Sequence, residues 1–253
     1  MVQGDMTGEG DRRSTSDVKF GSGPLARVTN AVYWYLVTGA LMIVAALPGA
    51  LPIQFLESSP GNAPVLALCL APLAPAFAAG LFALRDRKRA DALTPARSFL
   101  RGYRLNWADA LRMAIPGLVF VAIGGLGAGV VGDGGALAGD GVSILAAVPE
   151  VYLGMLIVIG AVLALWTMNA MVISALFTFR VQDVARLATY YLFARWRVTL
   201  GGLSLVVLGA AILLLAGDFA FGTVAVLWTG AVLRNHRELT RDVEARFTAP
   251  ASE

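Results

Sequence analysis

Long apolar runs alternate with short polar segments along the chain, and this pattern predicts a bundle of membrane-spanning helices. Most runs hold about 18 residues or more, enough for an α-helix to cross a hydrocarbon core of about 30 Å. They are continuous stretches rich in Leu, Ala, Val and Gly, whereas strands of a transmembrane barrel would alternate over about 10 residues. We therefore expect six spans, at residues 30–51, 63–84, 113–131, 142–179, 198–217 and 219–233.

Two of these spans depart from the ideal length. Residues 142–179 exceed one crossing, and the pair Pro149 and Glu150 indicates a break near one membrane interface. Residues 219–233 would cover only about 22 Å as a helix, which is short for a crossing. Asp218 lies between the last two runs, so we expect a tight hairpin there.

Composition supports a single membrane domain with short polar ends. The mean hydropathy is +0.70 and 15% of residues are charged, against about 25% in a soluble domain. We expect a membrane domain over residues 24–236 and a cytoplasmic C-terminal tail over residues 237–253. Residues 1–23 are polar and lack the apolar core of a signal peptide, so we expect a disordered cytoplasmic tail.

The positive charges decide the expected orientation. All 20 Lys and Arg residues lie in four segments, at positions 12–27, 85–112, 180–197 and 234–246. The three remaining loops contain no basic residue and carry the acids Glu57, Asp133, Asp140 and Asp218. Because basic loops stay in the cytoplasm, the partition predicts six spans with both termini cytoplasmic.

The densest basic stretch, residues 94–112, has the pattern of a helix that lies in the membrane interface. Thr94 and Pro95 provide an N-cap and a first helical residue. On a helix, one arc of about 80° holds all the arginines and another face holds most of the large apolar side chains. The resulting interfacial or docking candidates are Arg97, Phe99, Arg101, Arg104, Trp107 and Arg112.

This stretch has two open interpretations. The arginines would contact anionic headgroups while the rings, including Tyr103, enter the acyl boundary, which is simple lipid anchoring. Alternatively, the same surface would dock a cytoplasmic partner. A second charged amphipathic stretch, at residues 180–197, precedes the fifth span in the same way, so we expect interfacial helices before spans three and five.

Polar residues within the spans are the other functional candidates, because a polar group in hydrocarbon is costly. They are Asn30, Glu150 and Asn169. The two asparagines are expected to form interhelical hydrogen bonds. Glu150 is expected near the outer interface, either solvated or lining a path.

Two segments resemble signatures of the YesL family, bacterial membrane proteins with an unassigned domain. They are "RVTNAVYWYLVTGALMIVAALPGALP" and "ARSFLRGYRLNWADAL", and the resemblance covers roughly residues 24–236. The chain departs from the family where "ESSPGNAP" replaces a Thr-rich stretch between the first two spans. The residues that match the family pattern are Asn30, Trp34, Pro48, Arg97, Phe99 and Asn106.

The resemblance implies a multi-pass protein of the bacterial cytoplasmic membrane, without a known activity or catalytic residue. Such proteins tend to be encoded near sugar-uptake ABC transporters and polysaccharide-degradation genes. ABC transporter subunits are therefore candidate partners, beside the anionic headgroups of the bilayer. The oligomeric state stays open.

The sequence offers little chemistry for catalysis. His236 is the single histidine, Cys69 is the single cysteine, and neither a G-x-S-x-G nor an H-E-x-x-H motif occurs. We expect no catalytic residue, cofactor, metal or nucleic-acid partner. The leading hypothesis is a non-enzymatic accessory component of carbohydrate uptake; the alternatives are a small permease, a structural or lipid-interacting protein and, least favoured, a membrane enzyme.

Overall fold

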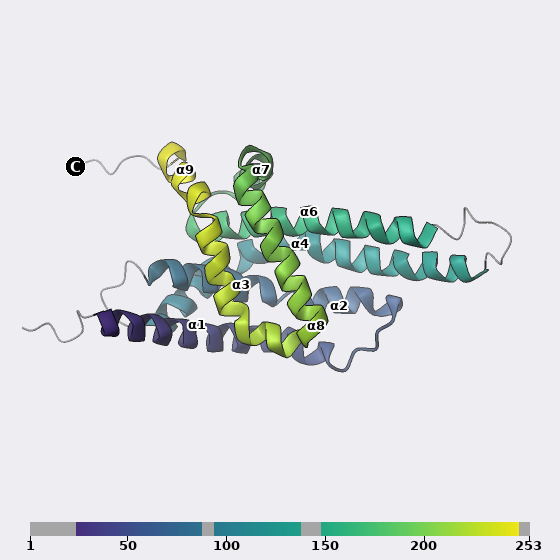
Figure 1. Ribbon diagram of the computed structural model, residues 1–253, viewed down its shortest axis with the longest axis horizontal. Coiled ribbons are helices and arrows are strands. Elements are labelled where there is room, and N and C mark those ends of the chain that lie inside the picture. The colour runs from purple at the N-terminus through teal and green to yellow at the C-terminus, as the bar shows by residue number, and fades with distance from the viewer. Residues whose placement is uncertain (1–23, 88–93, 138–147, 248–253) are drawn as a thin grey trace, which may run out of the picture.

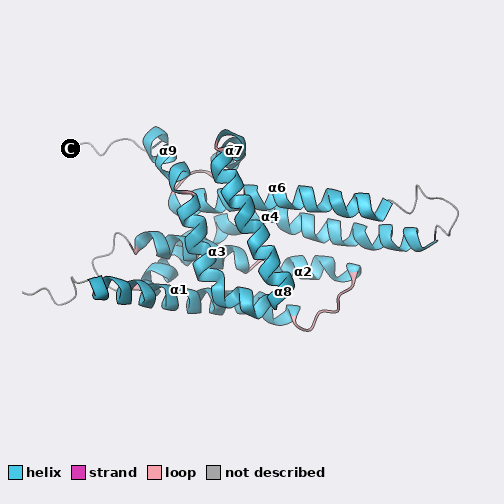
Figure 2. Ribbon diagram, viewed as in Figure 1, coloured by secondary structure: helices cyan, strands magenta, loops and turns pink. Residues whose placement is uncertain are grey.

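The computed structural model describes residues 24–87, 94–137 and 148–247, and every regular element within them is a helix (Figures 1 and 2). The expected tail at residues 1–23 lies outside the described residues. In chain order the elements are α1 Pro24–Ile53, the short 3-10 helix η1 Pro60–Asn62, α2 Ala63–Leu70, α3 Leu73–Asp86, α4 Pro95–Leu137, α6 Val148–Leu176, α7 Val181–Ala194, α8 Trp196–Asn235 and α9 Arg237–Phe247.

The predicted fold class, an all-α membrane bundle, is confirmed. Within the described residues, five helical stretches are long and apolar enough to cross a membrane: Arg27–Ile53, Pro60–Asp86, Pro95–Val131, Glu150–Leu176 and Trp196–Asn235. The count is five, where the sequence predicts six spans, because the last two predicted spans both belong to α8.

A sharp turn divides α8 into two arms. Gly217 has φ 80° and ψ 176°, which is not helical. Beyond it the chain runs back beside the first arm, as Figure 1 shows. Trp228 Nε1 donates to the Leu205 carbonyl at 3.1 Å, and Asn235 Nδ2 donates to the Val198 carbonyl at 2.9 Å. These bonds define an antiparallel hairpin.

The hairpin accounts for the short sixth run. Its arms are about 21 and about 18 residues long, or about 31 and 27 Å at 1.5 Å per residue. At its tip, Gln54 Nε2 lies 3.4 Å from Asp218 Oδ2, so the turn sits at the end of α1. The turn expected at Asp218 is centred on Gly217.

Small residues place α3 at the centre of the bundle, where it contacts α1, α4, α6 and α8. Ala78, Ala79 and Ala83 are fully buried. A Cβ added at Gly80 would lie 2.6 Å from Met42 Sδ. These small residues between the larger ones let neighbouring helices approach α3 closely, as is common in membrane bundles.

The second apolar span is interrupted. The structure ends α2 at Leu70 and begins α3 at Leu73, because Pro72 cannot supply the backbone N–H that would continue the helix. The break is held against α1, where a Cβ on Gly49 would lie 1.9 Å from the Cys69 carbonyl oxygen. Only a glycine allows this approach of the two helices.

The remaining differences concern helix ends. The break expected at Pro149 and Glu150 is the first turn of α6, and residues 142–147 lie outside the described part. The segment expected as a tail from residue 237 begins as α9, which packs onto the bundle through Leu239 and Val243, both fully buried. The tail's remaining residues, 248–253, are not described.

Both predicted amphipathic segments form helices. The first is the start of α4, which continues without interruption for 43 residues. This corresponds to about 64 Å, twice the thickness of a hydrocarbon core. The second is α7, a separate helix that buries Val184, Ala188 and Tyr191.

The turn at Gly217 can be tested by adding a single methyl group. A side chain is strained at φ 80° and ψ 176°, a region that is essentially restricted to glycine, so Gly217→Ala should cost about 1–3 kcal/mol of stability. No neighbouring atom lies within 4 Å of the added Cβ, so the cost would come from the backbone alone. The midpoint of thermal unfolding in a neutral detergent measures it.

Gly222→Ala is the matched control, because Gly222 lies in the second arm and its Cβ also meets open space. It should leave stability unchanged or raise it by up to about 1 kcal/mol. Equal midpoints for the two variants would contradict the hairpin.

Candidate functional site

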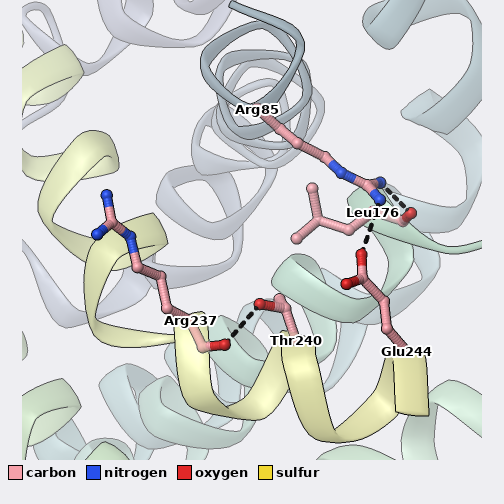
Figure 3. Close-up of polar contacts among 5 residues, drawn as sticks. All are labelled: Arg85, Leu176, Arg237, Thr240 and Glu244. Atoms are coloured by element: carbon pink, nitrogen blue, oxygen red, sulfur yellow. Dashed lines mark hydrogen bonds and ion pairs between the residues drawn. The ribbon is translucent and has the colours of Figure 1, made fainter. Parts of the chain in front are cut away.

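Charged side chains converge where α3 and α6 end, α4 and α7 begin and α9 packs, a region that we call the basic end of the bundle. Arg85, in the last turn of α3, donates a hydrogen bond to the carbonyl oxygen of Leu176, at the end of α6 (Figure 3). Its other terminal nitrogen lies 3.4 Å from a carboxylate oxygen of Glu244 in α9. The guanidinium also lies 5.5 Å from the centroid of the Phe177 ring. Arg85 therefore ties three helices together.

Asp242 forms a second link between α9 and the bundle. It accepts a hydrogen bond from the Tyr191 hydroxyl at 2.8 Å and pairs with Arg195 at 3.0 Å. Tyr191 is buried, and this hydrogen bond would be lost if α9 moved away. Hydrogen bonds that involve an ionised group are roughly twice as strong as neutral ones.

His236, between α8 and α9, makes the most deeply buried polar contact of the basic end. It is fully buried, and Asn169 of α6 is 3% exposed. The Nε2 of His236 lies 2.8 Å from Asn169 Oδ1, and the Nδ1 of His236 lies 2.8 Å from the Val232 carbonyl oxygen. The interhelical hydrogen bond expected for Asn169 is present, and its partner is the single histidine.

The protonation state of this pair follows from burial. His236 lies one residue beyond the span, and desolvation lowers its pKa from 6.5 to about 4, opposed in part by the bond to Val232. A carbonyl can only accept, so Nδ1 carries the proton of the neutral ring and Nε2 accepts. Both nitrogens of the neutral ring are therefore hydrogen-bonded when the Asn169 amide turns its nitrogen toward Nε2. Both nitrogens of a doubly protonated ring are hydrogen-bonded when the amide presents Oδ1.

The ion pairs of Arg85 with Glu244 and of Arg195 with Asp242 form a clamp between α9 and the rest of the bundle. The acids and bases named above bond to one another or to backbone carbonyls, which fixes α9 and the end of α8 against α6 and α7. Within the described residues, no group of three or more His, Cys, Asp or Glu side chains could hold a metal ion. The clamp thus orients helices and leaves the basic surfaces around it available to ligands.

The first turns of α4 form one such surface. Arg97, Leu100, Arg101, Arg104 and Leu105 line an open groove of about 450 Å³, which we call the α4 groove. All five side chains are exposed. The arginines therefore occupy one exposed side of α4, which they share with the two leucines, while Phe99 and Tyr103 lie on the opposite side.

The opposite side of α4 anchors the helix to the protein. Ser98 donates a hydrogen bond to Asp86. Phe99 is 2% exposed and belongs to the same core as Trp34 and Leu84, and Tyr103 packs against that core.

The expectation that the Phe99 ring enters the acyl boundary is therefore wrong, because the ring is buried on the side of α4 that meets α1 and α3, where protein removes it from water as effectively as lipid would. Tyr103 lies on the same side and is half-buried. Trp107 is 53% exposed, as an interfacial ring would be. Arg112 lies further along α4 and pairs with Asp109 at 2.9 Å.

The two polar candidates of α6 lie far apart. Glu150 is exposed in the first turn, as expected for a position near an interface. Asn169 lies 19 residues further along, which is about 28 Å. The two side chains therefore cannot contribute to one binding site. Asn30 is partly exposed near the start of α1.

Two further residues that match the family pattern, Trp34 and Asn106, have structural roles. Trp34 donates from Nε1 to the Ala83 carbonyl at 3.0 Å and is buried. Asn106 donates to the Gly102 carbonyl at 3.0 Å, one turn earlier in α4. Pro48 lies exposed within α1. These contacts pin α1 to α3 and satisfy a polar side chain locally.

The clamp residues were missed as site candidates by the sequence analysis. Arg85 and Arg195 entered only the charge count, and Asp242 and Glu244 fell in the expected tail. The available signal was the four-residue spacing of Leu239 and Val243, which is typical of a helix with one buried face.

No family model, curated protein or solved structure matches the chain.

The buried histidine predicts a pH dependence of stability. Its pKa is lower in the folded chain than the usual 6.5, so the unfolded chain binds the proton more tightly. The contribution of the neutral ring to the free energy of unfolding should be present in full above pH 6.5. It should be lost as the pH drops from 6.5 to about 4, which lowers the free energy of unfolding by about 3 kcal/mol in total. The thermal midpoint measured in neutral detergent between pH 7.5 and pH 4.5 records the decline.

His236→Gln isolates this effect, because carboxylates titrate equally in both proteins and no other histidine exists. The variant should show a shallower decline over this range. An identical pH dependence in the two proteins would show that the buried ring is not responsible.

Proposed function

We propose that this protein is a non-enzymatic accessory subunit of a carbohydrate uptake system in a bacterial cytoplasmic membrane, with the α4 groove as its docking surface. The observation that carries the proposal is the α4 groove itself, where three exposed arginines and two exposed leucines share one face of a helix anchored on its other side.

The spacing of the groove residues suits an acidic amphipathic helix. Arg97, Arg101 and Arg104 follow one another at intervals of four and three residues, which places them along one side of α4. Leu100 and Leu105 provide apolar contacts between the charges. A partner helix with carboxylates beside an apolar stripe would be complementary to this surface.

The anchoring of α4 favours docking energetically. Phe99 and Ser98 fix the helix to α1 and α3 before any partner binds. A preformed surface loses less conformational entropy on association than a mobile one. This supports an interaction surface, and the resemblance to the YesL family supports ABC transporter subunits as the class of partner.

The permease alternative has weaker support. It relies on Glu150 and Asn169 as lining residues, but the buried side chain of Asn169 is bonded to His236 and is therefore engaged in holding helices together. A transport path through the bundle would have to use other residues.

Purification from native membranes in a mild detergent tests the proposal. Mass spectrometry should identify transporter subunits with the wild-type chain. The triple variant Arg97→Gln, Arg101→Gln, Arg104→Gln should lose them by at least about tenfold, because each charged hydrogen bond contributes about 1.5–3 kcal/mol. The triple variant Arg234→Gln, Arg237→Gln, Arg241→Gln removes the same charge elsewhere and should retain them.

A photo-crosslinking residue at Leu100 should join the chain to a transporter subunit, and one at the exposed Leu214 of α8 should not. Equal losses in the two triple variants, or purification without any transporter subunit, would contradict the proposal. Solute movement by the purified chain alone in liposomes would favour the permease.

A further inference from the structure

A second basic groove lies at the open end of the α8 hairpin, where both arms meet α9. Its volume is about 610 Å³, and we call it the hairpin groove. Four arginines from three segments border it: one from the first arm, one from the second and two from α9. They are Arg197, Arg234, Arg237 and Arg241.

Within the described residues, these four arginines form no ion pair with a carboxylate. Arg85 and Arg195 of the basic end pair with Glu244 and Asp242. In contrast, no ion pair joins an arginine of the hairpin groove to a carboxylate within the described chain. Glu238 is the single acid in the lining and is exposed. The groove therefore carries an excess of positive charge that its own residues do not neutralise.

The floor of the groove consists mainly of apolar residues of the two α8 arms, together with Ser204 and Asn235. Val198, Leu205 and Ala231 line it beside Gly201. A Cβ on Gly201 would lie 2.1 Å from Asn235 Oδ1, so the glycine lets Asn235 bridge the arms through its bond to the Val198 carbonyl. Arginines thus stand at the mouth of a cleft whose floor belongs to two apolar helices.

The position of the groove indicates a membrane interface. All four arginines lie at or just beyond the ends of the span Trp196–Asn235. Trp196 is 63% exposed, and the Arg197 guanidinium lies 5.7 Å from its ring centroid. Exposed tryptophans are enriched at the level of lipid headgroups.

We propose that the hairpin groove binds the phosphate of an anionic phospholipid, with its acyl chains against the apolar arms of α8. Guanidinium groups bind phosphate oxygens through paired hydrogen bonds. The shared chemistry is that of a phosphate group, and the apolar floor and interfacial position favour a lipid over free phosphate. This inference is independent of the proposed accessory role, because it concerns different residues and a different ligand.

The full-length chain, purified in an uncharged detergent, can be tested for lipid binding by native mass spectrometry. The probes are phosphatidylglycerol, which is anionic, phosphatidylcholine, which is zwitterionic, and inorganic phosphate. We expect phosphatidylglycerol to be retained about tenfold more strongly than phosphatidylcholine, since the net charge of the lipid decides its attraction to the arginines.

Paired charge variants distinguish a site from general attraction. Arg234→Gln with Arg237→Gln should weaken phosphatidylglycerol binding by about 10- to 100-fold. Arg97→Gln with Arg101→Gln, in the α4 groove, removes the same charge and should leave binding within about twofold of the wild type. Arg241→Gln, a single change at an exposed position, should give a smaller loss and serves if the double variant does not fold.

Three results would overturn the proposal. Equal losses in the two double variants would show attraction by net charge, and equal retention of the two lipids would show that headgroup charge is irrelevant. Binding of inorganic phosphate without lipid, lost in the hairpin-groove variant, would assign the site to a soluble phosphate.

Discussion

A buried histidine at the end of α8 determines how the last third of the chain is arranged. His236 is fully enclosed and meets Asn169 of α6. A polar ring in such surroundings costs free energy unless its nitrogens are bonded. This requirement holds the end of the second α8 arm against α6, and the arm can reach that position only if the chain reverses at Gly217. The hairpin bonds and the ion pairs that hold α9 act together with this contact.

The closure also places both basic grooves on the same end of the bundle. The α4 groove lies at the start of α4, and the hairpin groove lies where α8 ends and α9 begins. Between them, Glu244 and Asp242 engage Arg85 and Arg195 and fix α9. Arginines that pair with a carboxylate of the protein thus have a structural role. Those that line the grooves form the surfaces for which we propose a ligand, a protein partner at the α4 groove and a lipid at the hairpin groove.

The sequence predicts those parts of the structure that depend on local pattern. Apolar length and the partition of basic residues suffice for the helical spans and for a reversal next to Asp218, since both are properties of the chain read in order. They cannot predict which way Phe99 faces, because its environment is formed by Trp34 and Leu84 of other helices. They also miss Arg85, whose partners Leu176 and Glu244 lie 91 and 159 residues away.

The central claim is that the chain returns at Gly217, so that α9 lies on the same side of the membrane as the start of α4. Single cysteines in a Cys69→Ala background, treated on intact cells with a membrane-impermeant thiol reagent, test it most directly. Suitable exposed positions are Arg101→Cys, Ala245→Cys and, at the opposite end, Ser58→Cys. We expect Ser58→Cys to be labelled at once and the other two to be labelled only after the membrane is opened. Labelling of Ala245→Cys on intact cells, with Arg101→Cys still protected, would show that the second arm does not return and would contradict the account.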